Sequence, residues 1–357
     1  TQGNGCYGIW GKMKTDLQGV YMRKPEKEFH PIKDKYVYIV FHGKALGDTL
    51  AFFPYVEQFR IENNCRVKVY LPKQEMIQYF KPVYPEIEFL SEDKHIGEWS
   101  RGGGKNLYFR LPFDADNVQT FKVGIGWDGR QHQPMQKSIS DILGMEFREG
   151  KDELKPRLAF KDHGRPVEEK YVAIGVHSNG PQMKYWNYPR GWEYVVKYLN
   201  HKGYKALAID LQYSNNRGER IQHKPGEAEK PKWVNQPPDN AELAHDNPLD
   251  VTMSNIKHSE FFIGLGSGLS WLSWALNKWV IMIHGFTKPW YEFQDKCVHV
   301  HNDKVCTGCW HVDYVLNLKE DWEMCPEHKG TDRHFECSKE IDPPMVFGAI
   351  DKVIKCL

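Results

Sequence analysis

Two adjoining stretches decide the fold: Tyr36-Val-Tyr-Ile-Val-Phe-His42 and Gly43-Lys-Ala-Leu-Gly-Asp-Thr49. The first is a continuous apolar run, which is typical of a parallel strand buried on both faces. The glycines of the second predict a tight turn, after which Asp48 or Thr49 is expected to begin a helix that ends near Asn63. Strand, turn and helix together form the repeating unit of an α/β sheet.

The same alternation continues along the chain in two successive halves. The first half is expected to contain strands at 66–71, 87–90 and 106–111 and a helix at 134–143. The second half is expected to contain strands at 171–177, 204–209, 260–263 and 279–284 and helices at 190–200, 249–257 and 267–276. This pattern predicts two Rossmann-like domains facing a crevice, and ligands of such sheets bind beyond the carboxyl ends of the strands.

Changes in composition suggest where the domains begin and end. Residues 150–170 are charged and interrupted by Pro and Gly, as is typical of a linker, and residues 344–355 have the apolar spacing of an amphipathic helix. The expected segments are an N-terminal arm or remnant module at 1–35, a first Rossmann-like domain at 36–150, a linker at 151–170, a second Rossmann-like domain at 171–300, a cysteine segment at 301–340 and a C-terminal helix at 341–357.

The overall charge excludes some classes of function. Lys and Arg number 48 against 47 Asp and Glu, which disfavours a nucleic-acid-binding protein or a polybasic membrane anchor. No apolar run is long enough to span a bilayer, and no signal peptide is recognisable. Four cysteines are scattered, as expected of reduced thiols in the cytoplasm: Cys6, Cys65, Cys297 and Cys356.

The other four cysteines are clustered: Cys306, Cys309, Cys325 and Cys337. Their spacing within a polar stretch predicts a tetrahedral thiolate site, and spacing alone suggests zinc. The metal would be structural, because four thiolates leave no open position for a substrate. Two disulfides are the alternative, which the lack of secretory character disfavours.

Asp48 is the candidate general base. It stands where a phosphate-binding loop would need a Lys, and a carboxylate there would repel a phosphate. Asp48 is instead expected to face the crevice as a proton acceptor. The alternative is that Asp48 only caps the helix.

The second half offers groups for an anion. Gly264-Leu-Gly-Ser-Gly-Leu-Ser270 joins a strand to a helix, so that glycines admit a diphosphate and the helix start presents free N–H groups. A turn packed by small residues is the alternative. Lys184 could neutralise a leaving diphosphate and Ser178 could donate a hydrogen bond, although Lys184 could equally be a solvated surface residue. Asp114 and Asp116 could hold a divalent cation, but a plain polar loop is favoured.

With these residues assembled, the chain resembles the heptosyltransferases of the two-Rossmann (GT-B) glycosyltransferases, in their lipopolysaccharide-heptosyltransferase-like branch. The resemblance lies in ALGDT (45–49), HSNGPQMKYWNYPRGW (177–192) and IGLGSGLSWLSWALN (263–277). CTGCW (306–310) and CPEHKGTDRHFECS (325–338) narrow it to the bacterial autotransporter heptosyltransferases.

This resemblance implies an inverting enzyme of the cytoplasm that moves heptose from ADP-heptose to serines of adhesin passenger domains. It implies iron at the four cysteines, no metal in catalysis, and a homo-oligomer, with a dodecamer as one form. Asp48 would be the base, Ser178 and Lys184 would contact the donor phosphates, and the helix start would bind the diphosphate.

The helix start comprises Ser267, Gly268 and Leu269, and Thr287 would line the donor pocket with Gly285 and Phe286. The chain departs from the lipopolysaccharide enzymes at Gly266 and Trp271, where they carry Asp and His, which leaves the sugar undetermined. Two alternatives remain: transfer to lipopolysaccharide or another glycan, and a non-catalytic module that binds a sugar nucleotide.

Overall fold

The computed structural model describes residues 32–91, 96–101, 104–109, 119–124, 130–148, 150, 154–178, 182–209, 237–244, 247–312 and 325–357. Most of the expected N-terminal arm, together with Cys6, Asp114 and Asp116, lies outside these ranges. No helix within them is long and apolar enough to cross a membrane.

The first half of the chain folds into a four-stranded parallel sheet with the order β3-β2-β1-β6. Its strands are β1 (Tyr36–Phe41), β2 (Arg66–Tyr70), β3 (Ile87–Phe89) and β6 (Gln119–Val123). Its helices are α2 (Leu46–Asn63), α3 (Ile77–Phe80) and α5 (Met135–Leu143), with short 3₁₀ turns η1 (Gln74–Met76) and η3 (Arg130–His132). The predicted buried strand and following helix are therefore confirmed, although the helix begins two residues before Asp48.

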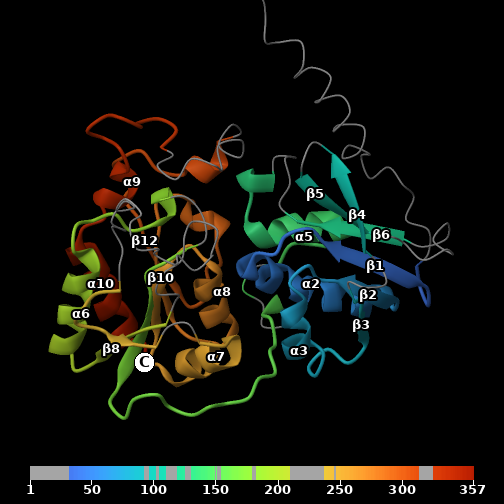
Figure 1. Ribbon diagram of the computed structural model, residues 1–357, viewed down its shortest axis with the longest axis horizontal. Helices are drawn as coiled ribbons and strands as arrows, with labels where there is room; N and C mark the ends of the chain where they lie inside the picture. Colours follow the sequence, from blue (N-terminus) through green and yellow to red (C-terminus); the bar gives the residue numbers. More distant parts are fainter. Residues whose placement is uncertain are drawn as a thin grey trace, which may run out of the picture.

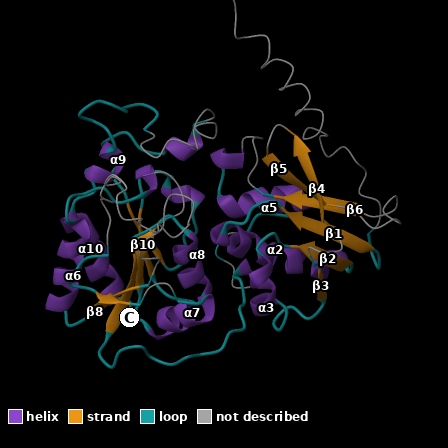
Figure 2. Cartoon of the chain, viewed as in Figure 1, coloured by secondary structure: helices purple, strands orange, loops and turns teal. Residues whose placement is uncertain are grey.

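In this half, one predicted strand belongs to a different sheet, and one strand of the parallel sheet was missed. Residues 106–111 were expected to join the parallel sheet, but β4 (Ile96–Arg101) and β5 (Gly104–Phe109) pair with each other as an antiparallel hairpin (Figure 2). The place beside β1 is taken by β6, which the sequence pattern did not reveal. The reason is its polar composition, QTFKV, in which only Phe121 and Val123 are buried.

The second half folds into a six-stranded parallel sheet with the order β12-β11-β10-β7-β8-β9. Its strands are β7 (Tyr171–Gly175), β8 (Lys205–Ala208), β9 (Glu242–Leu243), β10 (Phe262–Leu265), β11 (Val280–Ile283) and β12 (Cys297–Val300). Its helices are α6 (Gly191–His201), α7 (Leu249–His258), α8 (Gly268–Ala275), α9 (Glu336–Lys339) and α10 (Pro343–Ile354). Short 3₁₀ turns lie at η5 (Gln182–Lys184), η6 (Pro289–Tyr291) and η7 (Cys309–His311).

Helices cover both faces of the second sheet (Figure 2). One apolar cluster unites α6 and α10 with one face, whereas α7 and α8 pack on the other. The C-terminal helix starts as its sequence dictates, because Asp342 caps it through the amide of Met345 and two prolines follow at its first positions.

Residues 154–170 run between the two sheets with little regular structure (Figure 1). The amide of Ala159 donates to the carbonyl of Tyr79 (2.8 Å) in the first half, and the amide of His163 donates to Ser254 Oγ (2.9 Å) in the second. The connection is thus fastened to both halves.

Helices α2 and α8 lie against each other between the two sheets (Figure 1). They approach closely because glycine occupies the contact: a Cβ at Gly268 would lie 2.9 Å from Leu46 Cβ and 3.3 Å from the backbone nitrogen of Gly47. A Cβ at Gly47 would in turn lie 3.2 Å from Trp271 Cδ1. The hydrophobic core runs without a break through this contact.

We expect Gly268→Ala to destabilise the protein by about 1–3 kcal/mol, because the added methyl group overlaps Leu46 and the backbone of α2. Thermal unfolding measures the effect. Gly348→Ala in α10 is the matched control: its Cβ meets nothing within 4 Å, so helix propensity alone should stabilise that variant by up to about 1 kcal/mol. Equal melting of the two variants would contradict the close approach of α2 and α8.

Candidate active site and cysteine module

The predicted site residues follow the carboxyl ends of neighbouring strands. Asp48 follows β1, Ser178 follows β7, and Ser267 follows β10. Strands β7 and β10 are adjacent although they are distant in sequence, so Ser178 and Ser267 lie at the point where the strand order changes direction. Ligands of doubly wound sheets bind at such a point.

Asp48 is the third residue of α2 and not its cap. The capping position is Ala45, which makes no side-chain capping hydrogen bond, so Asp48 does not occupy the position of a helix cap. A side chain in the first turn still benefits from the positive end of the helix dipole, which favours the ionised carboxylate. The carboxylate reaches back over the glycine turn, with Asp48 Oδ2 3.4 Å from where a Cβ of Gly43 would stand.

Helix α8 begins as predicted, with Ser267 in extended conformation at the capping position. The Ser267 side chain makes no capping hydrogen bond. The amides of Gly268 and Leu269 belong to the first turn, where a helix supplies no carbonyl partners. Because Gly268 contacts Leu46 and Gly47, this helix start lies next to the turn that carries Asp48.

Ser178 and Lys184 come from the segment that follows β7. Ser178 is buried, and its hydroxyl has no hydrogen-bond partner within the part of the chain that the structure describes. Lys184 ends η5, and its Nζ lies 5.7 Å from the ring centroid of Phe286, in the loop that follows β11. The structure therefore places Lys184 beside the loop that was predicted to line the donor pocket.

Glu292 is a buried carboxylate that sequence reasoning missed. Its Oε1 accepts a hydrogen bond from Thr287 Oγ1 (3.0 Å), and its Oε2 accepts one from the indole nitrogen of Trp271 (2.9 Å). Burial raises the pKa of Glu292, the two hydrogen bonds and Lys184 act in the opposite direction, and Asp48 raises it further. A lone acid among the aromatics of Trp290-Tyr-Glu-Phe293 was the only signal in the sequence.

The charge of Asp48 also affects the pKa of Tyr291. Burial raises the pKa of Tyr291 well above its usual value, and the carboxylates of Asp48 and Glu292 add to that effect. Asp48, Lys184, Tyr291 and Glu292 therefore interact electrostatically, although they come from both halves of the chain.

The clustered cysteines form what we call the cysteine module, residues 301–312 and 325–339. Its four cysteines are free thiols; Cys306 is half-buried and the other three are buried. Burial, then neighbouring cysteines, raise the pKa of both Cys309 and Cys337 to about 12. The four thiols are therefore neighbours in the structure, as a thiolate metal site would require, but no three of them lie within 4.8 Å of one another.

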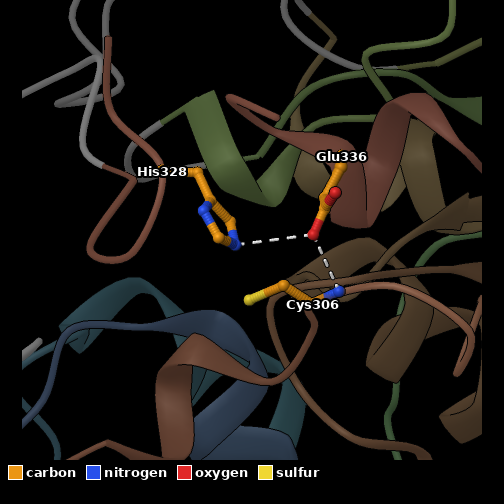
Figure 3. A group of neighbouring side chains, drawn as sticks. All are labelled: Cys306, His328 and Glu336. Atoms are coloured by element: carbon orange, nitrogen blue, oxygen red, sulfur yellow. Dashed lines mark hydrogen bonds and ion pairs between the residues drawn. The ribbon is translucent and has the colours of Figure 1, made fainter. Parts of the chain in front are cut away.

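Another set of side chains in the module is close enough to hold a metal. The ligand atoms of Cys306, His328 and Glu336 all lie within 4.8 Å of one another (Figure 3). Glu336 is already engaged, because it accepts the amide of Cys306 (3.0 Å) and pairs with Arg333 (2.6 Å). His328 and Glu336 therefore surround the thiol of Cys306 as neighbours that the cysteine spacing did not reveal.

The module is bonded to the loop after β11. The amide of Gly308 and the hydroxyl of Thr307 both donate to the carbonyl of Gly285 (2.8 and 2.7 Å), and the amide of Trp310 donates to the carbonyl of Phe286 (3.0 Å). A Cβ at Gly285 would overlap the backbone carbonyl of Cys337, so only glycine fits there. The module therefore fixes the position of this loop.

The module also reaches the first half through His311. Its Nε2 accepts the amide of Lys288 (2.9 Å), so its Nδ1 must carry the proton that is donated to the carbonyl of Gln131. Burial lowers the pKa of His311 to about 4, which favours this neutral form. One imidazole thus joins the loop after β11 to η3.

Two parallel sheets, with the first turn of α2 packed against the start of α8, have the architecture of the two-Rossmann (GT-B) glycosyltransferases. No family model matches the chain. It is 35% identical to the autotransporter heptosyltransferase Aah of Escherichia coli over 321 residues, which are 89% of this chain and 74% of Aah. The chain belongs to the autotransporter heptosyltransferases.

A solved relative agrees with this assignment. The dodecameric, iron-containing heptosyltransferase TibC of Escherichia coli, in complex with ADP-D-β-D-heptose, superimposes with a TM-score of 0.72 at 30% identity. The match covers 94% of this chain and 81% of TibC. BimC of Burkholderia thailandensis, an inactive autotransporter heptosyltransferase, is 28% identical over 331 residues, 89% of this chain and 68% of BimC.

Buried histidines next to the loop after β11 predict sensitivity to acid. His284 donates from Nδ1 to the carbonyl of Thr287 (2.9 Å), and its Nε2 lies 3.0 Å from His299 Nδ1. Burial lowers the pKa of His284 to about 3 and that of His299 to about 4. In the unfolded chain these histidines bind protons near pH 6.5, whereas the folded protein keeps them neutral.

We therefore expect the free energy of unfolding to decrease as the pH falls from about 6.5 towards about 4, because the unfolded state then binds more protons. Urea unfolding across this range measures the slope. His284→Asn should reduce the slope by about one bound proton. An unaltered slope in His284→Asn would contradict the burial of a neutral His284.

Proposed function

We propose that this protein transfers heptose from ADP-heptose to serine hydroxyls of an autotransporter adhesin passenger, with inversion at the anomeric carbon. One observation carries the proposal: the turn of α2 that bears Asp48 lies against the start of α8, where Gly268 contacts Leu46 and Gly47. A base and an anion-binding helix start are thereby adjacent. Membership of the autotransporter heptosyltransferases, and the ADP-heptose bound to TibC, support this choice of sugar and acceptor.

The proposed reaction is a single displacement. Asp48 accepts the proton of the serine hydroxyl while the serine oxygen attacks the anomeric carbon, and the bond from that carbon to the diphosphate breaks. ADP leaves with the bonding electrons. The amides of Gly268 and Leu269, the ammonium group of Lys184 and the hydroxyl of Ser178 stabilise the charge that develops on it. Thr287 lines the donor pocket, and its hydrogen bond to Glu292 holds it in place.

We propose that the two sheets bind different substrates. We assign acceptor binding to residues 36–150 and donor binding to residues 171–300, joined by the linker at 151–170. Because TibC is dodecameric and acts in the same family, we propose a homo-oligomer, and a cytoplasmic site of action follows from the nucleotide-sugar donor.

We assign a structural iron ion to Cys306, Cys309, Cys325 and Cys337, as the iron of TibC and the proximity of the thiols support. Four thiolates complete a tetrahedral set, so the metal would fold the polar module and leave the chemistry to Asp48. Through the bonds to Gly285 and Phe286, the folded module would hold the loop that carries Thr287.

Asp48→Asn tests the function directly. An adhesin passenger fragment incubated with wild-type protein and ADP-heptose should gain mass in steps of one heptose, as intact mass spectrometry measures. Asp48→Asn should reduce the rate by about 10²–10⁴-fold while ADP still binds, because only the proton acceptor is lost.

Lys184→Met is the matched control, in which ADP binding and not the proton acceptor should be affected. It should weaken ADP binding by about 10- to 100-fold, because a charge-assisted hydrogen bond to phosphate is lost. Donor binding by the wild type without any transfer to the passenger would reject the proposed activity and would group this chain with the inactive BimC.

Cys309→Ser tests the metal. Elemental analysis should show loss of the bound metal, and the melting temperature should fall by several degrees because the module loses its folding free energy. Cys356→Ser is the control, since Cys356 is exposed at the end of α10 and should affect neither quantity. Full metal content with unchanged melting in Cys309→Ser would reject the thiolate site.

A further inference from the structure

Glu292 occupies an unusual position for a carboxylate. Only 4% of the residue is exposed, and its two oxygens accept hydrogen bonds from neutral donors, the indole of Trp271 and the hydroxyl of Thr287. Removing a carboxylate from water is costly unless hydrogen bonds and nearby charge compensate. A hydrophobic residue of the same size would avoid that cost, so the retained carboxylate calls for a role beyond packing.

The end of β10 leaves room for this carboxylate. A Cβ at Gly266 would lie 3.3 Å from Glu292 Oε1 and 3.5 Å from Thr287 Oγ1. Any side chain at position 266 would therefore press on the Glu292 carboxylate. The absence of a side chain at Gly266 allows Glu292 to reach Trp271 beneath the turn that precedes α8.

Trp271 transmits the position of Glu292 to the other half of the protein. The indole is 2% exposed, and its Cδ1 lies 3.2 Å from where a Cβ of Gly47 would stand. Gly47 immediately precedes Asp48 in the first turn of α2. On its other side the indole packs edge-on against Trp274 and Phe293, so its ring is enclosed.

We propose that the hydrogen bond between Glu292 and Trp271 is a positioning device for Asp48. It fixes the rotation of the indole, and the indole fixes the distance between the first turn of α2 and the start of α8. This inference rests on the proposed function, in which Asp48 is the base. Glu292 acts through Trp271 and does not contact the substrates.

The charges around Glu292 are consistent with this role. Glu292 lies within electrostatic reach of both Asp48 and Lys184, the groups assigned to the acceptor proton and the donor diphosphate. A shift of about 1 Å in a reacting group can reduce the rate about 100-fold, so a small rotation of Trp271 is sufficient to affect catalysis.

Two substitutions at the same position separate the hydrogen bond from packing. Glu292→Gln keeps an acceptor for Trp271 and a group that can bond Thr287, whereas Glu292→Met keeps the volume and loses both bonds. We expect Glu292→Met to lower kcat by about 10- to 100-fold with the ADP dissociation constant unchanged. Glu292→Gln should retain most of kcat. Trp271→Phe should reproduce the Met variant, and the double substitution should be no worse than either one.

Hydrogen exchange monitored by mass spectrometry provides a readout that does not need turnover. Glu292→Met should accelerate exchange in the peptide that covers the first two turns of α2, although Glu292 itself lies in the other half of the protein. Glu292→Gln should leave that peptide protected. Glu340→Met, at an exposed position directly after the cysteine module, is the control and should change neither exchange nor kcat.

The two hypotheses fail in different ways. If the wild type transfers no sugar, the proposed function is rejected, yet exchange in α2 still decides whether Glu292 positions this helix. If Glu292→Gln and Glu292→Met lose the same fraction of kcat, or if exchange in α2 is the same in both, the positioning role of the hydrogen bond is rejected.

Discussion

The structure depends on one steric constraint: helices α2 and α8 meet at two glycines, Gly47 and Gly268, each of which leaves room for a side chain of the other helix. Gly47 and Gly268 let two helix starts approach closely, each following the carboxyl end of a central strand. Two positive dipole ends that face one another would be unfavourable without negative charge between them. Asp48 supplies one negative charge in the first turn of α2, and the anion that the start of α8 is suited to bind would supply another. The contact between α2 and α8 therefore sets the shape of the candidate site, and the positive helix ends beside it favour an anionic ligand.

A second constraint comes from outside the sheets. The loop after β11 is anchored by the buried side chains of Phe286, Tyr291 and Phe293, and two of its backbone carbonyls are bonded in addition to the cysteine module. The module in turn consists largely of turns, and its buried thiols favour protonation in the absence of a cation. Its own order would therefore depend on the metal that we propose for the four cysteines. The position of the loop that carries Thr287 therefore depends on the cysteine module as well as on packing against the sheet.

How far the sequence predicts this structure depends on what each residue contacts. Strands buried on both faces, such as β1, are recognised because every residue is apolar, whereas the edge strand β6 was missed since three of its five residues are polar. Asp48 and Ser267 were found because their positions after a strand already indicate a role. Glu292 was missed because its role depends on its hydrogen bonds to Thr287 and Trp271 and on its close approach to Gly266. No local sequence pattern indicates these contacts.

The packing of Cys337 on Gly285 has a consequence for the order of events during biosynthesis. Strand β11 and its loop emerge from the ribosome before the residues that hold them, which follow some fifty positions later. Both Rossmann sheets can therefore begin to form while the loop after β11 is still unsupported. The final arrangement of that loop must await translation of the cysteine module and α10. A nascent chain therefore forms its two sheets before the loop that carries Thr287 reaches its final position.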